Sequence, residues 1–461
     1  MAVLTTGSVC AVHEARSTTL TGWGRTAPSR ADVLVVDDDS LAEAVASAGA
    51  RGALVRGLGR SYGDAAQNGG GTVVRLVPPT GGIRLDASTG LVTAHAGVSF
   101  DDLLRHLVPK GYFVPVTPGT RFVTLGGAIA ADVHGKNHHV DGSFGNHLRS
   151  MTMLMADGAI VELTAESDPE LWWATIGGMG LTGIVVEATF AALRIETSRC
   201  VVDTTRTPDL DSLLAAMVEG DEQYRYSVAW VDLLAKGQHL GRGVLTRGDH
   251  ATVVQVTGHR DPTGYGPRML AAVPPGVPNV INHATVRAFN EMWFRKAPRR
   301  REGEIQTITR FFHPLDGIAA WNRVYGRPGF LQYQFVVPFD EEAALRGVIE
   351  RVVRSGRASF VAVLKRFGPG NPGPLSFPMA GWTLTLDLPA GVSGLSELLH
   401  DLDDRVLDAG GRHYLAKDAC TTPDSIRRGY PRLSEWQEAR HKADPGGLWI
   451  SDIARRLELI G

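Results

Sequence analysis

The stretch RGLGRSYGD, residues 56–64, carries three glycines and follows an apolar, strand-like segment at 53–55. Glycine has no Cβ, so the backbone N–H groups of such a turn can crowd around an anion. A second stretch, TLGGAIAADVHGKNHH at 124–139, places a glycine pair before a run of small residues and ends in histidines and a lysine. One loop for a diphosphate and a second beside a flat ring would together form a cofactor site. Taken alone, the first loop is equally compatible with an ordinary structural turn.

A nicotinamide-binding Rossmann fold is the first alternative. Its phosphate loop has the spacing G-x-G-x-x-G, opens a helix, and is followed about 20 residues later by an acidic residue. Here the spacing is G-x-G-x-x-x-G, and residues 69–77 read as a loop and a strand. The sequence therefore argues against a Rossmann site.

Composition narrows the class of protein. A chain of 461 residues is long enough for two domains, and its net charge of −2 offers no basic field for nucleic acid. No run of about 18 apolar residues predicts a membrane span. The N-terminus lacks the pattern of a signal peptide, so we expect a cytoplasmic protein or one peripheral at the plasma membrane. A periplasmic location reached without a signal peptide stays open.

The three cysteines, Cys10, Cys200 and Cys420, are far apart and odd in number. This usage indicates a reducing compartment and no disulfide framework. No C-x-x-C pair is present, so we expect neither a structural zinc nor an iron–sulfur cluster, and no metal site.

Secondary-structure patterns predict an α+β fold. In the first 195 residues we expect strands at 53–55, 72–77, 151–155, 159–163 and 184–193, with strand-like character over 83–100. From 196 onward we expect strands of one antiparallel sheet at 227–234, 252–257, 307–312, 330–338 and 382–388. Helices are expected at 101–107, 169–175, 341–355 and 395–409, with a helical tail.

The segment 267–302 differs from the rest because it mixes apolar residues and prolines with arginines and a lysine. Such a basic run is either a solvated face or a flap that meets anionic lipid headgroups or a phosphate. The sequence leaves both interpretations open.

The motifs RGLGRSYGDAAQNGGG, VPVTPGTRFVTLGGAIAADVHGKNHH, KRFGPGNPGPLSFP and YLAKD, in this order, resemble those of a known family. They are similar to flavin oxidases of the vanillyl-alcohol oxidase superfamily, with its PCMH-type FAD-binding domain. Within it they resemble the decaprenylphosphoryl-β-D-ribose 2′-oxidase family of actinobacteria, the flavin subunits of a 2′-epimerase. The resemblance spans nearly the whole chain, from LTGWGRTAPS at 20–29 to SDIARRLEL at 451–459.

The resemblance implies an FAD-binding domain at 1–195, a substrate domain with an antiparallel sheet flanked by helices at 196–413, and a C-terminal segment at 414–461 that returns to the FAD domain. The RGLGRSYGD loop would hold the FAD diphosphate. Many relatives link the flavin covalently to a histidine before the serine of this loop. Arg60 stands there, so we expect non-covalent FAD. The implied FAD-binding residues are Arg56, Gly57, Leu58, Gly59, Arg60, Ser61, Tyr62, Gly63, Gly119, Thr124, Leu125, Gly126, Gly127, Ala131, Asp132, Val133, His134, Gly178, Gly183, Val185 and Tyr414.

The resemblance also implies a reaction. The 2′-hydroxyl of a polyprenyl-phosphoryl (decaprenyl-phosphoryl) β-D-ribose would be oxidised to a ketone, with FAD as the hydride acceptor. An NADH-dependent keto-reductase partner would then complete epimerisation to the arabinose donor for cell-wall arabinan. Lys417 would take the hydroxyl proton or stabilise the oxyanion, and Tyr62 and Lys136 complete the expected catalytic set. The expected substrate-binding residues are Lys136, Gln332, Gln334, Lys365, Thr385 and Lys417.

One strand departs from the family pattern. Mycobacterial members carry a cysteine beside the flavin that nitroaromatic inhibitors trap, and GWTLTLDLP places Thr385 there. A hydroxyl cannot replace a thiolate in that reaction, so we expect such inhibitors to bind reversibly at best. Thr383 stands where relatives have an amide, which leaves open an altered substrate.

Other functions remain open. A sugar-lactone or alditol oxidase of the same superfamily would often show a His-Trp pair near the C-terminus, and none occurs around 440–442. A paralogue could oxidise a soluble ribosyl phosphate or nucleoside. A flavin-fold protein could also bind a polyprenyl phosphate without turnover, against which Lys136 and Lys417 argue.

Overall fold

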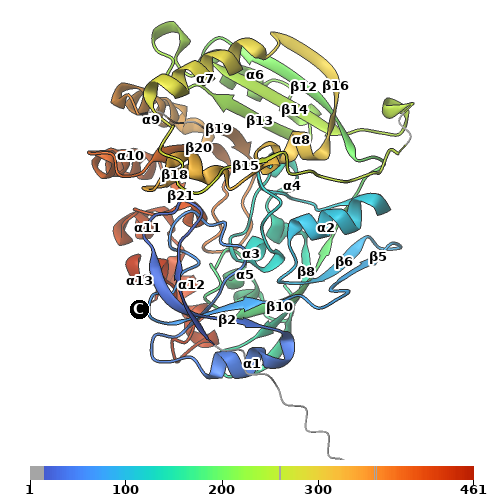
Figure 1. The fold of residues 1–461 in the computed structure, drawn as a ribbon, viewed down its shortest axis with the longest axis vertical. Helices are drawn as coiled ribbons and strands as arrows, with labels where there is room; N and C mark the ends of the chain where they lie inside the picture. The colour runs from blue at the N-terminus through green and yellow to red at the C-terminus, as the bar shows by residue number, and fades with distance from the viewer. Residues whose placement is uncertain (1–14, 259–260, 358, 360, 461) are drawn as a thin grey trace, which may run out of the picture.

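A computed structural model describes residues 15–258, 261–357, 359 and 361–460 (Figure 1). Cys10 and the first 14 residues, on which the signal-peptide prediction largely rests, lie outside the described residues. No helix within the described ranges is long and apolar enough to cross a membrane.

The first half of the chain builds two small sheets in the lower part of Figure 1. One has the strand order β1-β2-β4-β3 and is mixed, because β2 and β3 both run parallel to β4. Its elements are β1 (Arg16–Leu20), β2 (Ser29–Val36), α1 (Asp38–Ala46), β3 (Ala53–Val55) and β4 (Thr72–Leu76). The glycine-rich loop joins β3 to β4 without opening a helix. The structure thus confirms that this is no Rossmann phosphate loop.

The second small sheet is antiparallel, with the order β5-β6-β10-β8-β9. Its strands are β5 (Ile83–Asp86), β6 (Leu91–His95), β8 (Leu148–Leu154), β9 (Ile160–Leu163) and β10 (Ile184–Ala191), and its helices are α2 (Phe100–Leu107), α3 (Leu125–Ala130), α4 (His138–Asp141) and α5 (Pro169–Thr175). A buried apolar cluster that includes Leu34, Val74, Ile184 and Trp449 joins the two sheets. The strand-like character expected over 83–100 ends early, because Ser99 and Asp102 form a capping box that starts α2.

The second half forms one large antiparallel sheet, with the order β16-β12-β14-β13-β19-β20-β18-β21, in the upper part of Figure 1. Its strands are β12 (Arg199–Thr207), β13 (Tyr226–Val231), β14 (Gly243–His250), β16 (Arg300–Thr307), β18 (Phe330–Val337), β19 (Ala362–Phe367), β20 (Gly381–Pro389) and β21 (Arg412–His413). Helices α6 (Leu210–Val218), α9 (Glu342–Ser355) and α10 (Leu395–Asp408) bury one face of it. This layout confirms the predicted α+β class.

Two predicted strands of this sheet are wrong. Residues 252–257 form a tight turn, in which the backbone N–H and hydroxyl of Thr252 donate to the Gln255 side chain at 2.9 and 3.1 Å. Residues 307–312 form α8 (Ile308–Phe312), because the Thr307 hydroxyl accepts from the Arg310 N–H and caps the helix. Local capping overrides the strand preference of β-branched and aromatic residues at both places.

The segment 267–302, for which both a solvated face and a flap stayed open, contains α7 (His283–Lys296) and the start of β16. Three arginines of its basic run form ion pairs with nearby acids, Arg295 with Glu291, Arg300 with Glu302 and Arg301 with Glu304. Much of the run is therefore compensated locally.

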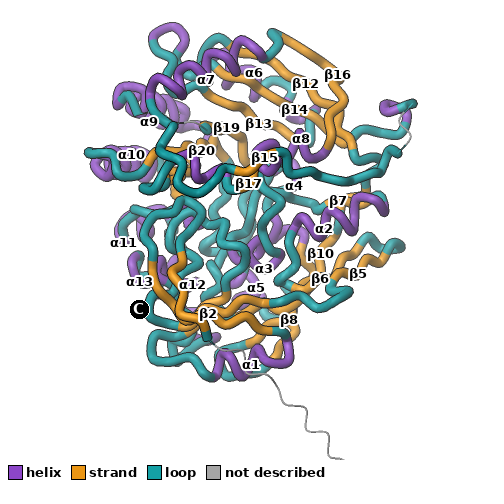
Figure 2. The backbone as a smooth tube through the Cα atoms, viewed as in Figure 1, coloured by secondary structure: helices purple, strands orange, loops and turns teal. Residues whose placement is uncertain are grey.

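The C-terminal segment packs against the N-terminal half through α11 (Pro423–Gly429), α12 (Leu433–Ala443) and α13 (Asp452–Arg456). Ala53 donates to the Leu448 carbonyl at 2.8 Å, and Arg456 binds both Asp64 and Asp418. These contacts hold the C-terminal segment against the N-terminal half, and the division at 195 and 413 stays a prediction. Figure 2 shows that loops fill much of the zone between the large sheet and the smaller ones.

Candidate active site

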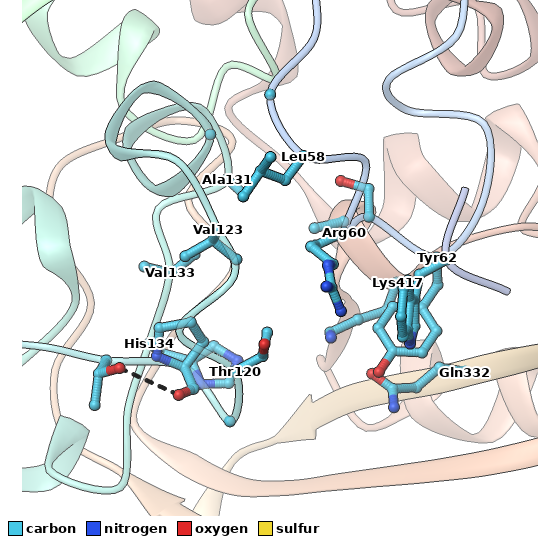
Figure 3. A pocket seen from close by; sticks show the side chains of 18 of the residues that line it. Leu58, Arg60, Tyr62, Thr120, Val123, Ala131, Val133, His134, Gln332 and Lys417 are labelled. Carbon is cyan, nitrogen blue, oxygen red and sulfur yellow. Dashed lines mark hydrogen bonds between the residues drawn. The ribbon is translucent and has the colours of Figure 1, made fainter. Parts of the chain in front are cut away.

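A cavity of about 790 Å³ lies where these loops meet the open face of the large sheet. Its wall combines the loop after β3, residues 117–120, the segment from α3 to Lys136, one face of β18 to β20, and residues 414–417. Figure 3 shows Arg60 pointing into the open space between two walls. One wall carries Thr120, Val123, Val133 and His134, and the other carries Tyr62, Gln332 and Lys417.

The glycine-rich loop presents a row of backbone donors to this cavity. In the described part of the chain, no group accepts a hydrogen bond from the backbone N–H of residues 57–61. The flanking N–H groups of Arg56 and Tyr62 are paired, with the carbonyls of Val74 and Ala416 at 2.8 and 2.9 Å. All five residues line the cavity and none of them is fully buried, so these adjacent N–H groups are free to bind an anion.

Two features fix the shape of this loop. The Arg56 guanidinium donates to the carbonyls of Ala66 and Thr21 at 2.6 and 2.7 Å, and burial lowers its pKa to about 10. It thus braces the loop from within. A Cβ at Gly57 would lie 2.2 Å from the Thr124 hydroxyl, so glycine allows the loop to touch the start of α3.

A buried carboxylate, that of Asp132, fixes the position of the segment after α3. Asp132 is 0% exposed and accepts hydrogen bonds from Ser143, Gly145, Asn371 and Ser376 at 2.5–2.9 Å. Burial raises its pKa. This network places the neighbouring residues from 131 to 134 on the cavity wall.

His134 joins this wall to the large sheet. Its Nε2 lies 3.0 Å from the Gln334 amide nitrogen, and its Nδ1 lies 3.0 Å from Lys365 Nζ. Burial, and then the nearby Lys365, hold the pKa of His134 well below its usual value, so the ring is neutral. With the Gln334 amide in this orientation, Nε2 accepts and Nδ1 carries the proton. Burial, and then the charge of Lys417, lower the pKa of Lys365 to about 7.

Lys417 occupies the opposite wall, in the turn Leu415–Lys417. Its Nζ lies 4.0 Å from the centre of the Tyr62 ring. Burial lowers the pKa of Lys417 to about 7, against the opposing effect of Asp387. Burial also raises the pKa of Tyr62 well above its usual value, so this phenol stays protonated. Of these two side chains, Lys417 is the one able to accept a proton near neutral pH.

Lys136 lines the cavity but turns toward α8. Its Nζ donates to the Phe311 carbonyl and lies 4.0 Å from the centre of that ring. Burial lowers its pKa to about 8.

Comparison with known proteins identifies the family. A model described as an FAD binding domain matches residues 29–164. The chain is 46% identical over 450 residues to the decaprenylphosphoryl-beta-D-ribose oxidase of Mycolicibacterium smegmatis, a match that covers 96% of this chain and 97% of that protein. The chain belongs to the decaprenylphosphoryl-β-D-ribose oxidase family. It is therefore an FAD-dependent oxidoreductase.

Two further relatives match different lengths of the chain. The chain is 39% identical over 372 residues to an uncharacterized protein in the mprA 5′ region of Streptomyces coelicolor, which covers 78% of this chain and 100% of that protein. A shorter match, 29% identical over 111 residues, is to a putative D-arabinono-1,4-lactone oxidase of Neurospora crassa; it covers 24% of this chain and 20% of that one.

The cavity fits the cofactor of this oxidase family. The free N–H groups at 57–61 suit a diphosphate, and a flat ring system has room beside Val133, His134 and Tyr414. The Tyr414 hydroxyl donates to the Ala131 carbonyl at 2.7 Å, so this side chain braces the wall that the ring would meet. When bound, FAD supplies hydride-accepting chemistry.

The structure brings most of the predicted site residues together. Among the described residues, all of them line the cavity except Gly63, Leu125, Asp132, Gly178 and Gln334. A Cβ at Gly63 or Gly178 would lie about 2 Å from a backbone oxygen, 1.9 Å from that of Asp418 and 2.0 Å from that of Ala174, so both glycines serve close packing. Leu125 is core, whereas Asp132 and Gln334 support residues that do line the cavity.

Sequence reasoning missed several lining residues, chiefly Asp387, Trp230, Asp316 and the α7 residues Phe289 and Trp293. A signal for Asp387 was present. The strand GWTLTLDLP alternates, so that Leu384 and Leu386 face the buried helices, and Thr385 and Asp387 face the cavity. The residues of α7 carried no comparable signal, because only the fold brings that helix to the cavity.

Proposed function

We propose that this chain oxidises the 2′-hydroxyl of a polyprenyl-phosphoryl β-D-ribose to a ketone. The observation that carries the proposal is one cavity lined both by three lysines and by a set of aliphatic and aromatic side chains. A lipid-linked sugar phosphate has the same division of chemistry. The Mycolicibacterium smegmatis relative carries the name of such an oxidase.

The apolar part of the lining comes from β13, β14, α7 and the first half of β19 with the residue before it. Its lining residues are aliphatic or aromatic: Val228, Trp230, Val244, Phe289, Trp293, Val361 and Val363. Each CH₂ group that an isoprenoid tail buries there contributes about 0.8 kcal/mol, whereas a soluble sugar would leave this surface in water. The lining therefore favours a lipid-linked substrate over an alditol or a lactone.

The polar part of the lining suits the phosphate and the sugar. Lys365 and Lys136 have pKa values lowered by burial to about 7 and about 8. A phosphate placed beside them would favour their charged forms, because an opposite charge raises the pKa of an amine. We assign both lysines, with Gln332 and Thr385, to the binding of the phosphoryl sugar.

Lys417 is the proposed proton acceptor. Bound FAD would accept the hydride from C2′ of the sugar. The hydroxyl proton would pass to the uncharged Lys417 amine, whose pKa of about 7 suits a base at neutral pH. Tyr62, kept protonated by burial, would hold Lys417 in place and donate to the substrate.

We also propose where the enzyme acts and which reaction uses its product. The segment 267–302 exposes apolar side chains, among them Leu270 at 83% and Met292 at 57%, which suits peripheral contact with a membrane that holds the substrate. A cytoplasmic or membrane-peripheral enzyme would pass its keto-sugar to an NADH-dependent keto-reductase on the route to the arabinose donor of cell-wall arabinan.

The test is a panel of substrates under anaerobic conditions. Decaprenyl- and farnesyl-phosphoryl ribose, ribose 5-phosphate, an alditol and arabinonolactone are added separately to the oxidised holoenzyme. We expect the lipid-linked sugars to bleach the flavin band rapidly. Bleaching by the alditol or the lactone, with none by the lipid-linked sugars, would overturn the substrate assignment and favour the alternative oxidase.

A further inference from the structure

Asp387 is a buried carboxylate on the cavity wall that the proposed chemistry has not used. It is 0% exposed, lies on β20 opposite Gln332 of β18, and lines the same end of the cavity as Lys417. A buried ionised carboxylate is costly unless charges or hydrogen bonds compensate it. Its position beside the reacting groups therefore calls for a functional account.

The hydrogen-bond partners of Asp387 are uncharged. Gln332 Nε2 donates to one carboxylate oxygen at 2.5 Å, and the Tyr325 hydroxyl lies 3.4 Å from the other. In the described part of the chain, no arginine, lysine or histidine forms an ion pair with it at 4.0 Å or less. Gln332, which binds this carboxylate, lies beside Tyr62 and Lys417 in Figure 3, and Lys417 is the cation that lowers the pKa of Asp387 without forming an ion pair with it.

Most of the remaining groups at this end of the cavity are neutral or engaged elsewhere. The titratable or charged side chains that face the pair from the surrounding elements are Arg60 and Tyr62, His134, Tyr325, Asp316 and Lys365. Both tyrosines are kept protonated by burial, which raises their pKa values well above the usual one, and His134 is neutral. Asp316 is engaged by Arg121, with an oxygen 3.3 Å from its guanidinium.

We propose that Asp387 is the positioning residue that sets the charge of Lys417 across the cavity, and so the pH at which Lys417 can take a proton from the substrate. Burial raises the pKa of Asp387 to about 7, so the carboxylate is negative above that pH, and there it favours the ammonium form that results when Lys417 accepts the hydroxyl proton. Gln332, bonded to Asp387 and adjacent to Tyr62, fixes the carboxylate in this position. The charge coupling itself is independent of the substrate, and only its use in catalysis rests on the proposed function.

The sign of the effect follows from the charges. Burial lowers the pKa of Lys417, and Asp387 opposes that shift. Asp387→Asn keeps the shape and removes the charge, so Lys417 should lose its proton at a lower pH, by about one unit or more. Asp387→Glu keeps the charge and should restore much of the wild-type behaviour.

The experiment measures Lys417 directly in the holoenzyme without substrate. Trace acetic anhydride acetylates uncharged amines, and peptide mass spectrometry gives the labelling of Lys417 as a function of pH. The exposed Lys236 serves as an internal control whose profile should not change between variants. We expect the Lys417 midpoint to move down in Asp387→Asn and to return in Asp387→Glu. An unchanged midpoint in folded, FAD-loaded Asp387→Asn would overturn the inference.

A reciprocal measurement covers the case in which Asp387→Asn does not fold. Coupling between two titrating groups acts equally on both. In Lys417→Met, the protonated-carboxyl infrared band of Asp387 should persist to higher pH than in the wild type. A band unmoved by the loss of Lys417 would refute the coupling. Wild-type protein whose flavin no lipid-linked ribose bleaches would instead refute the proposed function alone.

Discussion

Gly57→Ala tests whether the contact between the two glycine loops shapes the FAD site. The added Cβ would lie 2.2 Å from Thr124 Oγ1 and 3.2 Å from Thr124 Cγ2, so the Thr124 side chain must move. That hydroxyl accepts from the Gly127 N–H at 3.2 Å and caps α3. Loss of such a cap costs about 0.5–2 kcal/mol. If that cost falls on cofactor binding, FAD affinity drops by about 2- to 30-fold.

Gly119→Ala is the matched control. Gly119 also lines the cavity, but a Cβ there would meet nothing within 4 Å. The assay titrates apoprotein with FAD and follows the quenching of flavin fluorescence, with thermal unfolding measured in parallel. We expect weaker binding in Gly57→Ala alone. Equal FAD affinity in Gly57→Ala and Gly119→Ala would refute the reasoning.

The remaining predictions concern the chemistry of the site. Lys417→Met should keep its FAD but slow anaerobic flavin reduction by about 100-fold or more; a rate near the wild-type one would remove Lys417 from the mechanism. The wild-type reduction rate should rise with pH through about 7, since the uncharged amine is the base, and a rate that falls over that range would contradict the assignment. Acid precipitation should release all of the flavin, because Arg60 cannot form the covalent link; a yellow pellet would show otherwise. Nitroaromatic inhibitors should leave the intact mass unchanged but add to it in Thr385→Cys, and an adduct on the wild type would disprove the role given to this position.

Much of the fold was predictable because local signals and tertiary packing agree. The helix at 395–408 repeats leucines on one face, and that face is buried in the structure. The strand predictions for residues 252–257 and 307–312 were wrong because Thr252 and Thr307 use their side chains to close turns. Composition alone cannot show whether a threonine will cap a helix or lie in a strand.

The site was predictable where a motif carries the chemistry, as in the glycine-rich loop and at Lys417. Asp387 could have been found from the alternation of its strand, because the residues facing the cavity are polar and those facing the helices are leucines. The contribution of Phe289 and Trp293 could not have been found from the sequence, because no local pattern links α7 to a cavity that is built from distant segments.

The central claim is oxidation at C2′ of a lipid-linked ribose. The most direct measurement mixes stoichiometric farnesyl-phosphoryl ribose with oxidised holoenzyme without oxygen, then reduces the product with borodeuteride and locates the deuterium by mass spectrometry. The account predicts one bleached flavin for each sugar that carries deuterium at C2′. A flavin that stays oxidised, or bleaching that leaves deuterium at another carbon, would contradict it.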